Sequence, residues 1–129
     1  MTTKSDQIEL LDDLLHDLGK YIAFPLNMLP ENPDEALFRD AVDQALNRTR
    51  TGPNGTQSAR SIWVNFLDEA GNGFDDEDGW QRIHGTVETA LSWGEKLAEP
   101  SLINERQQVV DDLRAVSVAI RQLRDKING

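Results

Sequence analysis

Apolar residues recur at alternating steps of three and four residues through almost the whole chain, and this helical period constrains the fold most. The clearest case is the C-terminal segment 109–127, where a heptad-like repeat places one apolar stripe on a single helix face. The stripe consists of Val109, Leu113, Val116, Ile120, Leu123 and Ile127. No segment alternates apolar and polar residues with a period of two over a useful length, so we predict helices and no sheet.

The N-terminal segment shows the same helical period. Its apolar stripe consists of Ile8, Leu11, Leu15, Leu18 and Ile22. Ser5 or Asp6 is expected to cap this helix, because a side-chain oxygen at that position can accept a free backbone N–H. Pro25 and Pro30 are expected to mark its end, because proline lacks the N–H that a helix interior uses.

Three more amphipathic segments complete the pattern: residues 31–49, 57–70 and 76–99. We expect Asn32 to cap the first of these and Pro100 to stop the last. The turn-rich segment 50–57 and the acidic segment 71–79 separate them. Five amphipathic helices in sequence predict an all-α fold, an antiparallel helical bundle in which residues 1–129 form a single domain.

The C-terminal stripe allows two interpretations. It can supply the core of the bundle, or it can form the seam of a homodimer, since sustained heptads are typical of helix–helix association between chains. Charge substitutions at Val116 or Ile120 would disrupt folding in the first case and assembly in the second.

Composition excludes several classes of function. The chain has 13 Lys and Arg against 23 Asp and Glu, a formal net charge of −10, which disfavours binding to nucleic acid and to anionic membranes. It has no cysteine, which excludes disulfides and thiolate metal sites. The N-terminus lacks the pattern of a signal peptide, and no apolar stretch approaches the roughly 20 residues that span a bilayer. We therefore expect a cytoplasmic protein.

The stretch 14–20, LLHDLGK, is the most informative local motif. With about 100° per residue, His16 points roughly 140° away from the centre of the apolar band, toward solvent. Asp12 and Asp13 precede His16 by one turn, and Gly19 and Lys20 follow it by one turn. We expect these residues to form an exposed strip beside the apolar face.

This motif resembles the H-D-x-G-K motif of HD-domain phosphohydrolases, which are all-helical, metal-dependent enzymes. The resemblance covers about seven residues and implies that His16 and Asp17 would be two metal ligands. A further upstream histidine belongs to that ligand set, but residues 1–15 contain none, and the other histidine of the chain, His84, lies far downstream. A degenerate or reduced HD-type phosphohydrolase is therefore one alternative.

The same residues also resemble the phosphoacceptor helices of histidine phosphotransfer proteins and the H-box of sensor kinases. The resemblance implies that His16 accepts a phosphoryl group and that Lys20 offsets its charge, with little bulk at Gly19. Asp17 matches the acidic residue that directly follows the histidine in the H-box. Glycine and lysine stand here in the reverse of the phosphotransfer order, and Pro25 follows later than the H-box proline does. A third interpretation is ordinary helix surface.

Two other features complete the set of candidates. Trp93 lies roughly 100° off the apolar stripe of its segment, which favours an interface or the rim of a pocket. Residues 68–79 match part of a calcium-binding loop, but Gly79 stands where the bidentate glutamate is required, so we expect only an acidic loop.

We therefore expect a non-enzymatic regulatory or adaptor protein that acts through helix-face contacts with a protein partner, such as a receiver-type signalling protein. Within this class the phosphorelay interpretation places the docking face at His16. We expect no bound metal and no cofactor. The alternatives are the reduced HD-type enzyme and a structural homodimer joined through its C-terminal helix.

Overall fold

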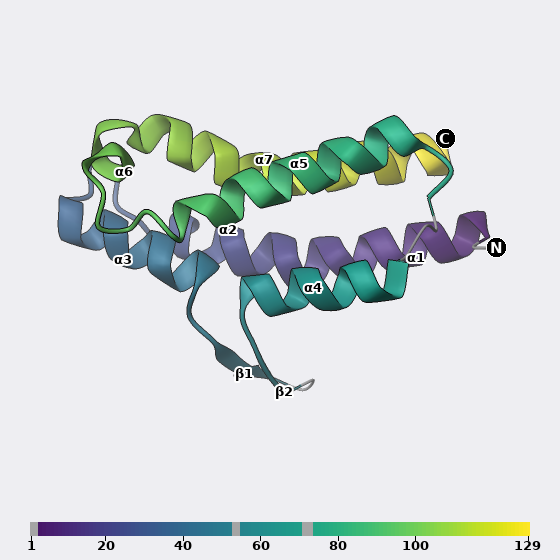
Figure 1. Cartoon of the computed structure of the whole chain (residues 1–129), viewed down its shortest axis with the longest axis horizontal. Helices are drawn as coiled ribbons and strands as arrows, with labels where there is room; N and C mark the ends of the chain where they lie inside the picture. Colours follow the sequence, from purple (N-terminus) through teal and green to yellow (C-terminus); the bar gives the residue numbers. More distant parts are fainter. Residues whose placement is uncertain (1–2, 53–54, 71–73) are drawn as a thin grey trace.

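A computed structural model describes residues 3–52, 55–70 and 74–129 and shows an elongated bundle of mostly antiparallel helices (Figure 1). Helices make up 76% of the structure, which confirms the predicted all-α class. The elements are α1 (Lys4–Leu14), η1 (Leu15–Gly19), α2 (Lys20–Asn27), α3 (Glu35–Leu46), β1 (Arg50–Gly52), β2 (Gly55–Gln57), α4 (Ala59–Ala70), α5 (Glu77–Trp93), α6 (Pro100–Asn104) and α7 (Arg106–Asn128).

The helices form two layers. In the view of Figure 1, α5 and α7 lie above α1, α2 and α4, and α3 continues the lower layer at one end. Helix α7 packs most extensively along α5 and also along α1, so it joins the two layers. The chain reverses direction between α2 and α3, between α4 and α5 and between α5 and α7, which gives the mostly antiparallel arrangement, whereas α3 and α4 run in the same direction (Figure 1).

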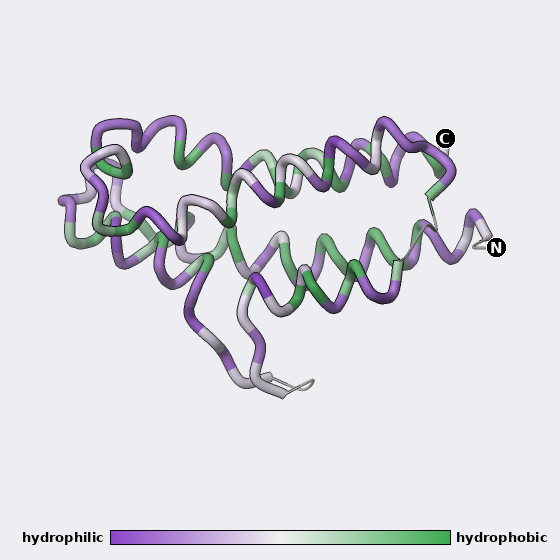
Figure 2. Tube along the Cα trace, in the orientation of Figure 1, coloured by the Kyte–Doolittle hydropathy of each residue, from purple (hydrophilic) through white to green (hydrophobic). Residues whose placement is uncertain are grey.

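One continuous apolar core lies between the layers. Of the six residues in the C-terminal stripe, five are at most 2% exposed and Ile127 is partly buried against them. Figure 2 shows the corresponding alternation of apolar and hydrophilic residues along the long helices. For this stripe the structure shows the first of the two interpretations, an intramolecular core.

A single π-helical turn, η1, separates α1 from α2 without breaking the helix. The buried residues Leu14, Leu18, Ile22 and Leu26 follow each other at steps of four. In a straight α-helix each such step rotates the side chain by about 40° away from the previous one. A π-turn bonds i to i+5 and holds one more residue, so it absorbs this rotation and keeps all four residues in the core.

Several predicted helix boundaries are wrong, and each error has a local cause. Thr3, not Ser5 or Asp6, caps α1 by accepting the N–H of Asp6 at 3.1 Å. Asp34, not Asn32, caps α3, with its Oδ1 2.8 Å from the N–H of Leu37.

Prolines also act differently from the prediction. Pro25 lies inside α2, which continues to Asn27 because Leu26 is buried in the core. Pro100 begins the short helix α6 rather than stopping the preceding helix, a position where its missing N–H has no cost.

The prediction of no sheet is also wrong. Strands β1 and β2 pair antiparallel, with Thr51 opposite Thr56, and this hairpin projects from the bundle (Figure 1). Three-residue strands are too short to show a period of two. Residues 53–54 of the predicted turn, and 71–73 of the acidic segment and of the calcium-like pattern, lie outside the described residues.

Within the described part of the chain, no helix combines the length and the apolar character needed to cross a membrane.

Candidate functional site

The predicted strip around His16 is only partly exposed. His16 and Lys20 are exposed, as are Asp12 and Asp13 on the preceding turn, while Asp17 is half-buried. Gly19 is buried, so its placement on the exposed strip is wrong. The prediction assumed about 100° for every residue, whereas the π-turn changes the rotation between His16 and the residues that follow.

Gly19 lies on η1 where the helix packs against α7. A Cβ atom added at Gly19 would lie 2.9 Å from the Oγ of Ser117 and 3.3 Å from Cδ1 of Leu15. Both distances are shorter than ordinary van der Waals contact. The glycine therefore serves helix packing, and the small surface neighbour that the phosphotransfer resemblance implies is missing.

His16 lines two separate hollows of the surface. The first, of about 360 Å³, lies between η1–α2 and the hairpin. It is lined by His16, Asp17, Lys20, Tyr21, Phe24, Arg50, Gln57 and Ile62. We call this hollow the hairpin hollow.

Tyr21 positions the hairpin beside α2. Its hydroxyl donates to the backbone carbonyl of Gln57 at 2.6 Å and lies 3.3 Å from that of Arg50. The guanidinium of Arg50 then lies over two rings, 4.8 Å from the centroid of Tyr21 and 5.9 Å from that of Phe24. Such cation–π contacts hold an arginine in place while leaving its charge available.

The second hollow, of about 440 Å³, lies between η1–α2 and α7. We call it the α7 groove. It is lined by Asp12, Leu15, His16, Gly19, Lys20, Ala23, Asn27, Ser117, Arg121 and Arg124. Arg124 donates to Asp12 at 3.1 Å and pairs with Asp125 at 3.2 Å. The hydrogen bond that Arg124 donates to Asp12 is the main cause that raises the pKa of Arg124 above its ordinary value.

Four cations line the two hollows beside His16, together with the carboxylates of Asp12 and Asp17. Lys20 and Arg50 lie in the hairpin hollow, and Lys20, Arg121 and Arg124 lie in the α7 groove. Only Arg124 among these four residues has an ion-pair partner in the part of the chain that the structure describes.

The structure does not bring the two histidines together into one site. His84 packs against two tryptophans, with ring centroids 5.6 Å from Trp63 and 6.1 Å from Trp80. Among residues 3–52, 55–70 and 74–129, no three His, Asp or Glu side chains lie close enough to hold one metal ion. The HD-type ligand set implied by His16 and Asp17 therefore gains no further ligand from the described residues.

Trp93, predicted to lie at an interface or a pocket rim, is a buried residue of the core. Its side chain is 7% exposed, and its indole Nε1 donates to Oδ2 of Asp112 on α7 at 2.8 Å. The Nζ of Lys96 lies 4.9 Å from the centroid of its ring. Trp93 is therefore buried against α7 although it lies off the apolar stripe of its own helix.

Three residues of the site, Tyr21, Phe24 and Arg50, were not among the candidates of the sequence analysis. Phe24 is 57% exposed although it lies in an apolar stretch, and Arg50 reaches the site only because the hairpin folds against Tyr21. A phenylalanine followed by proline near a helix end was the available signal for Phe24. No sequence signal placed Arg50, because no hairpin was predicted.

Comparison of the chain with protein-family models, with curated proteins and with solved structures gave no match.

Proposed function

We propose that this protein is a non-enzymatic cytoplasmic adaptor that binds an acidic protein partner through the surface around His16. The docking surface consists of His16, Lys20, Tyr21, Phe24 and Arg50. One observation carries the proposal: an exposed aromatic ring and two cations without ion-pair partners among the described residues surround one hollow. Exposed aromatic and arginine side chains at a shaped surface are typical of the residues that dominate protein–protein binding energy.

The charge of the surface supports an acidic partner. The molecule as a whole is strongly anionic, with a formal net charge of −10, and would repel such a partner at long range. Lys20 and Arg50 at the docking surface then supply the local attraction that orients the partner toward this face.

His16 adds a chemical role to this surface. An exposed imidazole can attack the phosphorus of an acyl phosphate on a receiver-type partner, forming an N–P bond while the P–O bond to the partner's aspartate breaks. The aspartate leaves as a carboxylate with the bonding electrons, and the second ring nitrogen of His16 keeps its proton. Lys20, one turn along the helix, lies where it can offset the incoming negative charge.

Capture of partners from the native host tests the adaptor function. The wild-type protein should retain a specific acidic partner that Phe24→Ala and Arg50→Glu lose. Val64→Ala is the matched control for Phe24→Ala. Val64 is also an exposed apolar residue, at 48%, but does not line the hollow. Equal retention of that partner by all variants would contradict the proposed docking surface.

Phosphoryl acceptance is tested with acetyl phosphate as a small donor. The wild-type protein should acquire an acid-labile phosphoryl group that His16→Gln lacks, while the control His84→Gln should still be labelled. A wild-type protein that stays unlabelled by acetyl phosphate and by the captured partner would refute the phosphorelay role and leave the adaptor role standing.

A further inference from the structure

Helix α2 has a second apolar face, which the described part of the bundle leaves exposed. Phe24 and Met28 are 57% and 70% exposed and are the two most exposed large apolar side chains among the described residues. Met28 donates its N–H to the carbonyl of Phe24 at 3.2 Å, so the two side chains are neighbours one helical turn apart. Tyr21 extends this face by three residues. We call Tyr21, Phe24 and Met28 the α2 stripe.

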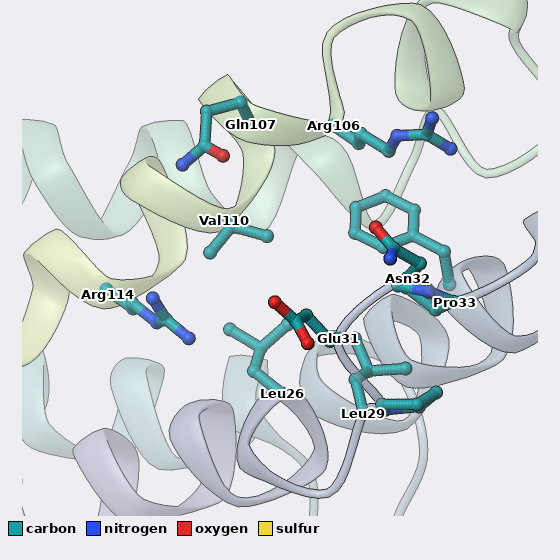
Figure 3. A pocket seen from close by; sticks show the side chains of 11 residues that line it. Leu26, Leu29, Glu31, Asn32, Pro33, Arg106, Gln107, Val110 and Arg114 are labelled. Carbon is teal, nitrogen blue, oxygen red and sulfur yellow. The ribbon is translucent and has the colours of Figure 1, made fainter.

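The opposite side of α2 already packs within the chain. Leu26 and Leu29 line, together with Phe38, a hollow of about 450 Å³ between the α2–α3 connection and α7 (Figure 3), and Leu26 is 4% exposed. At 3.6 residues per turn, Phe24 and Met28 each lie roughly 160° around the helix from Leu26. Packing inside the bundle therefore accounts for Leu26 but not for apolar side chains at Phe24 and Met28. Single exposed apolar residues are ordinary, whereas a contiguous group marks an interaction surface.

The first half of the α2 stripe also forms one wall of the hairpin hollow. Tyr21 and Phe24 line this hollow beside Arg50 of β1. The guanidinium of Arg50 lies 4.8 Å and 5.9 Å from the centroids of these two rings, so its charge is held directly beside the stripe. Lys20 is the second cation in the lining, against the carboxylate of Asp17. The apolar stripe is thus bordered by positive charge at its N-terminal end, and Met28 continues it beyond the hollow.

We infer that the α2 stripe binds an amphipathic helix of the acidic partner, which packs its apolar side chains on Phe24 and Met28 and places acidic side chains beside Lys20 and Arg50. This assignment rests on the proposed function, since it specifies which part of that partner docks. The stripe has the three- and four-residue spacing of one side of a helix–helix contact. An amphipathic helix laid in an apolar groove is a recurrent mode of peptide recognition, and the flanking charges select an acidic helix over a basic one.

Synthetic peptides test the chemistry of the occupant. The probe is a fluorescently labelled peptide of about five helical turns, with leucine at the a and d positions of its heptads and glutamate beside them. The matched peptide has lysine in place of glutamate. Fluorescence anisotropy should show the glutamate peptide binding at least about tenfold more tightly, although the net charge of −10 attracts the lysine peptide at long range. Equal or tighter binding of the lysine peptide would overturn the inference, as would failure of the glutamate peptide to bind at millimolar concentration.

A third peptide tests whether the occupant is a helix. It has the composition of the glutamate peptide with one central residue replaced by proline, which interrupts a helix. Binding should fall at least about tenfold, and circular dichroism should show that only the uninterrupted peptide gains helix in the complex. Equal binding of the proline peptide would show that an extended segment docks instead, and the helix assignment would be wrong.

Substitutions locate the contact on the protein. Met28→Glu introduces a charge into the α2 stripe outside the lining of the hairpin hollow, and it should weaken binding of the glutamate peptide at least about tenfold. Met28→Leu keeps the apolar surface and should bind like wild-type. Val118→Glu is the matched control, since Val118 on α7 is also an exposed apolar residue, at 49%. An equal loss in Val118→Glu would show general charge repulsion and contradict the site. Circular dichroism melts should show that all three variants are folded.

Capture of the native partner separates this inference from the proposed function. Met28→Glu should lose the acidic partner together with Arg50→Glu. A partner that Arg50→Glu loses and Met28→Glu retains would leave the docking surface standing and refute the docked helix. A partner that every variant retains equally, Phe24→Ala included, would contradict the proposed function and the inference together.

Discussion

At the scale of single residues, Gly19 shows how strongly packing constrains a position that looks like surface in the sequence. Glycine inside a helix costs about 1 kcal/mol relative to alanine. Its retention here has a structural reason, because a Cβ atom would lie 2.9 Å from Oγ of Ser117. The close approach of α7 to η1 depends on the missing side chain.

We expect Gly19→Ala to lower the free energy of unfolding by about 1 kcal/mol. Overpacking costs roughly 1–3 kcal/mol, which exceeds the roughly 1 kcal/mol that alanine gains over glycine in helix propensity. Ser117→Ala removes the Oγ that the new Cβ would meet without placing a glycine inside α7, so the double variant should recover most of the loss. Urea unfolding of both single variants and the double variant measures this coupling. Purely additive effects would show that Ser117 is not the obstacle.

Trp93 illustrates the same principle for an aromatic residue. Its position off the apolar stripe suggested exposure, yet its ring is buried and its Nε1–H is satisfied by Asp112 at 2.8 Å. A helix in a bundle has more than one neighbour, and a single stripe describes only one of them. Buried tryptophan usually finds a hydrogen-bond partner of this kind.

At the scale of elements, an ion pair between Asp76 and Lys126 joins the start of α5 to the end of α7. Asp76 caps α5 by accepting the N–H of Gly79 at 3.1 Å, and its Oδ2 lies 2.7 Å from Nζ of Lys126. The hydrogen bond from Lys126, followed by that from the Gly79 N–H, lowers the pKa of Asp76 below its ordinary value.

This lowered pKa makes stability depend on acid pH. The stabilising effect of the Asp76 carboxylate is fully present above the pKa of aspartate in the unfolded chain, about 3.9, and is lost as the pH falls through the lower pKa of the folded state. Thermal melts should therefore show wild-type more stable than Asp76→Asn at pH 7, with the difference shrinking below about pH 4. Asp13→Asn, at an exposed position on α1, is the control and should change stability less at pH 7. A constant difference across pH would contradict the role of the charge.

At the scale of the whole molecule, one core explains why α7 carries such a regular stripe. Val116 and Ile120 are fully buried within a single chain, although long heptad stripes often mark dimers. The homodimer remains a separate proposal, and it would have to use another surface than this stripe.

We expect Val116→Lys to destabilise the monomer by about 4 kcal/mol or more, because it buries an unpaired charge. Val118→Lys on the same helix is the matched control, since Val118 is 49% exposed and surface substitutions stay within about 0.5 kcal/mol. Denaturant unfolding at several protein concentrations measures both effects. A folded Val116→Lys protein that only loses self-association would show instead that the stripe joins two chains.

The sequence by itself determined the helical class, the five long helices and most of the core, because each follows from local apolar periodicity. It also determined that His16 and Lys20 face solvent. Only the tertiary structure decided the π-turn, the burial of Gly19 and Trp93, the hairpin and the position of Arg50 beside Phe24. These features depend on contacts between segments far apart in the sequence, such as Gly19 with Ser117, and local periodicity carries no information about such contacts.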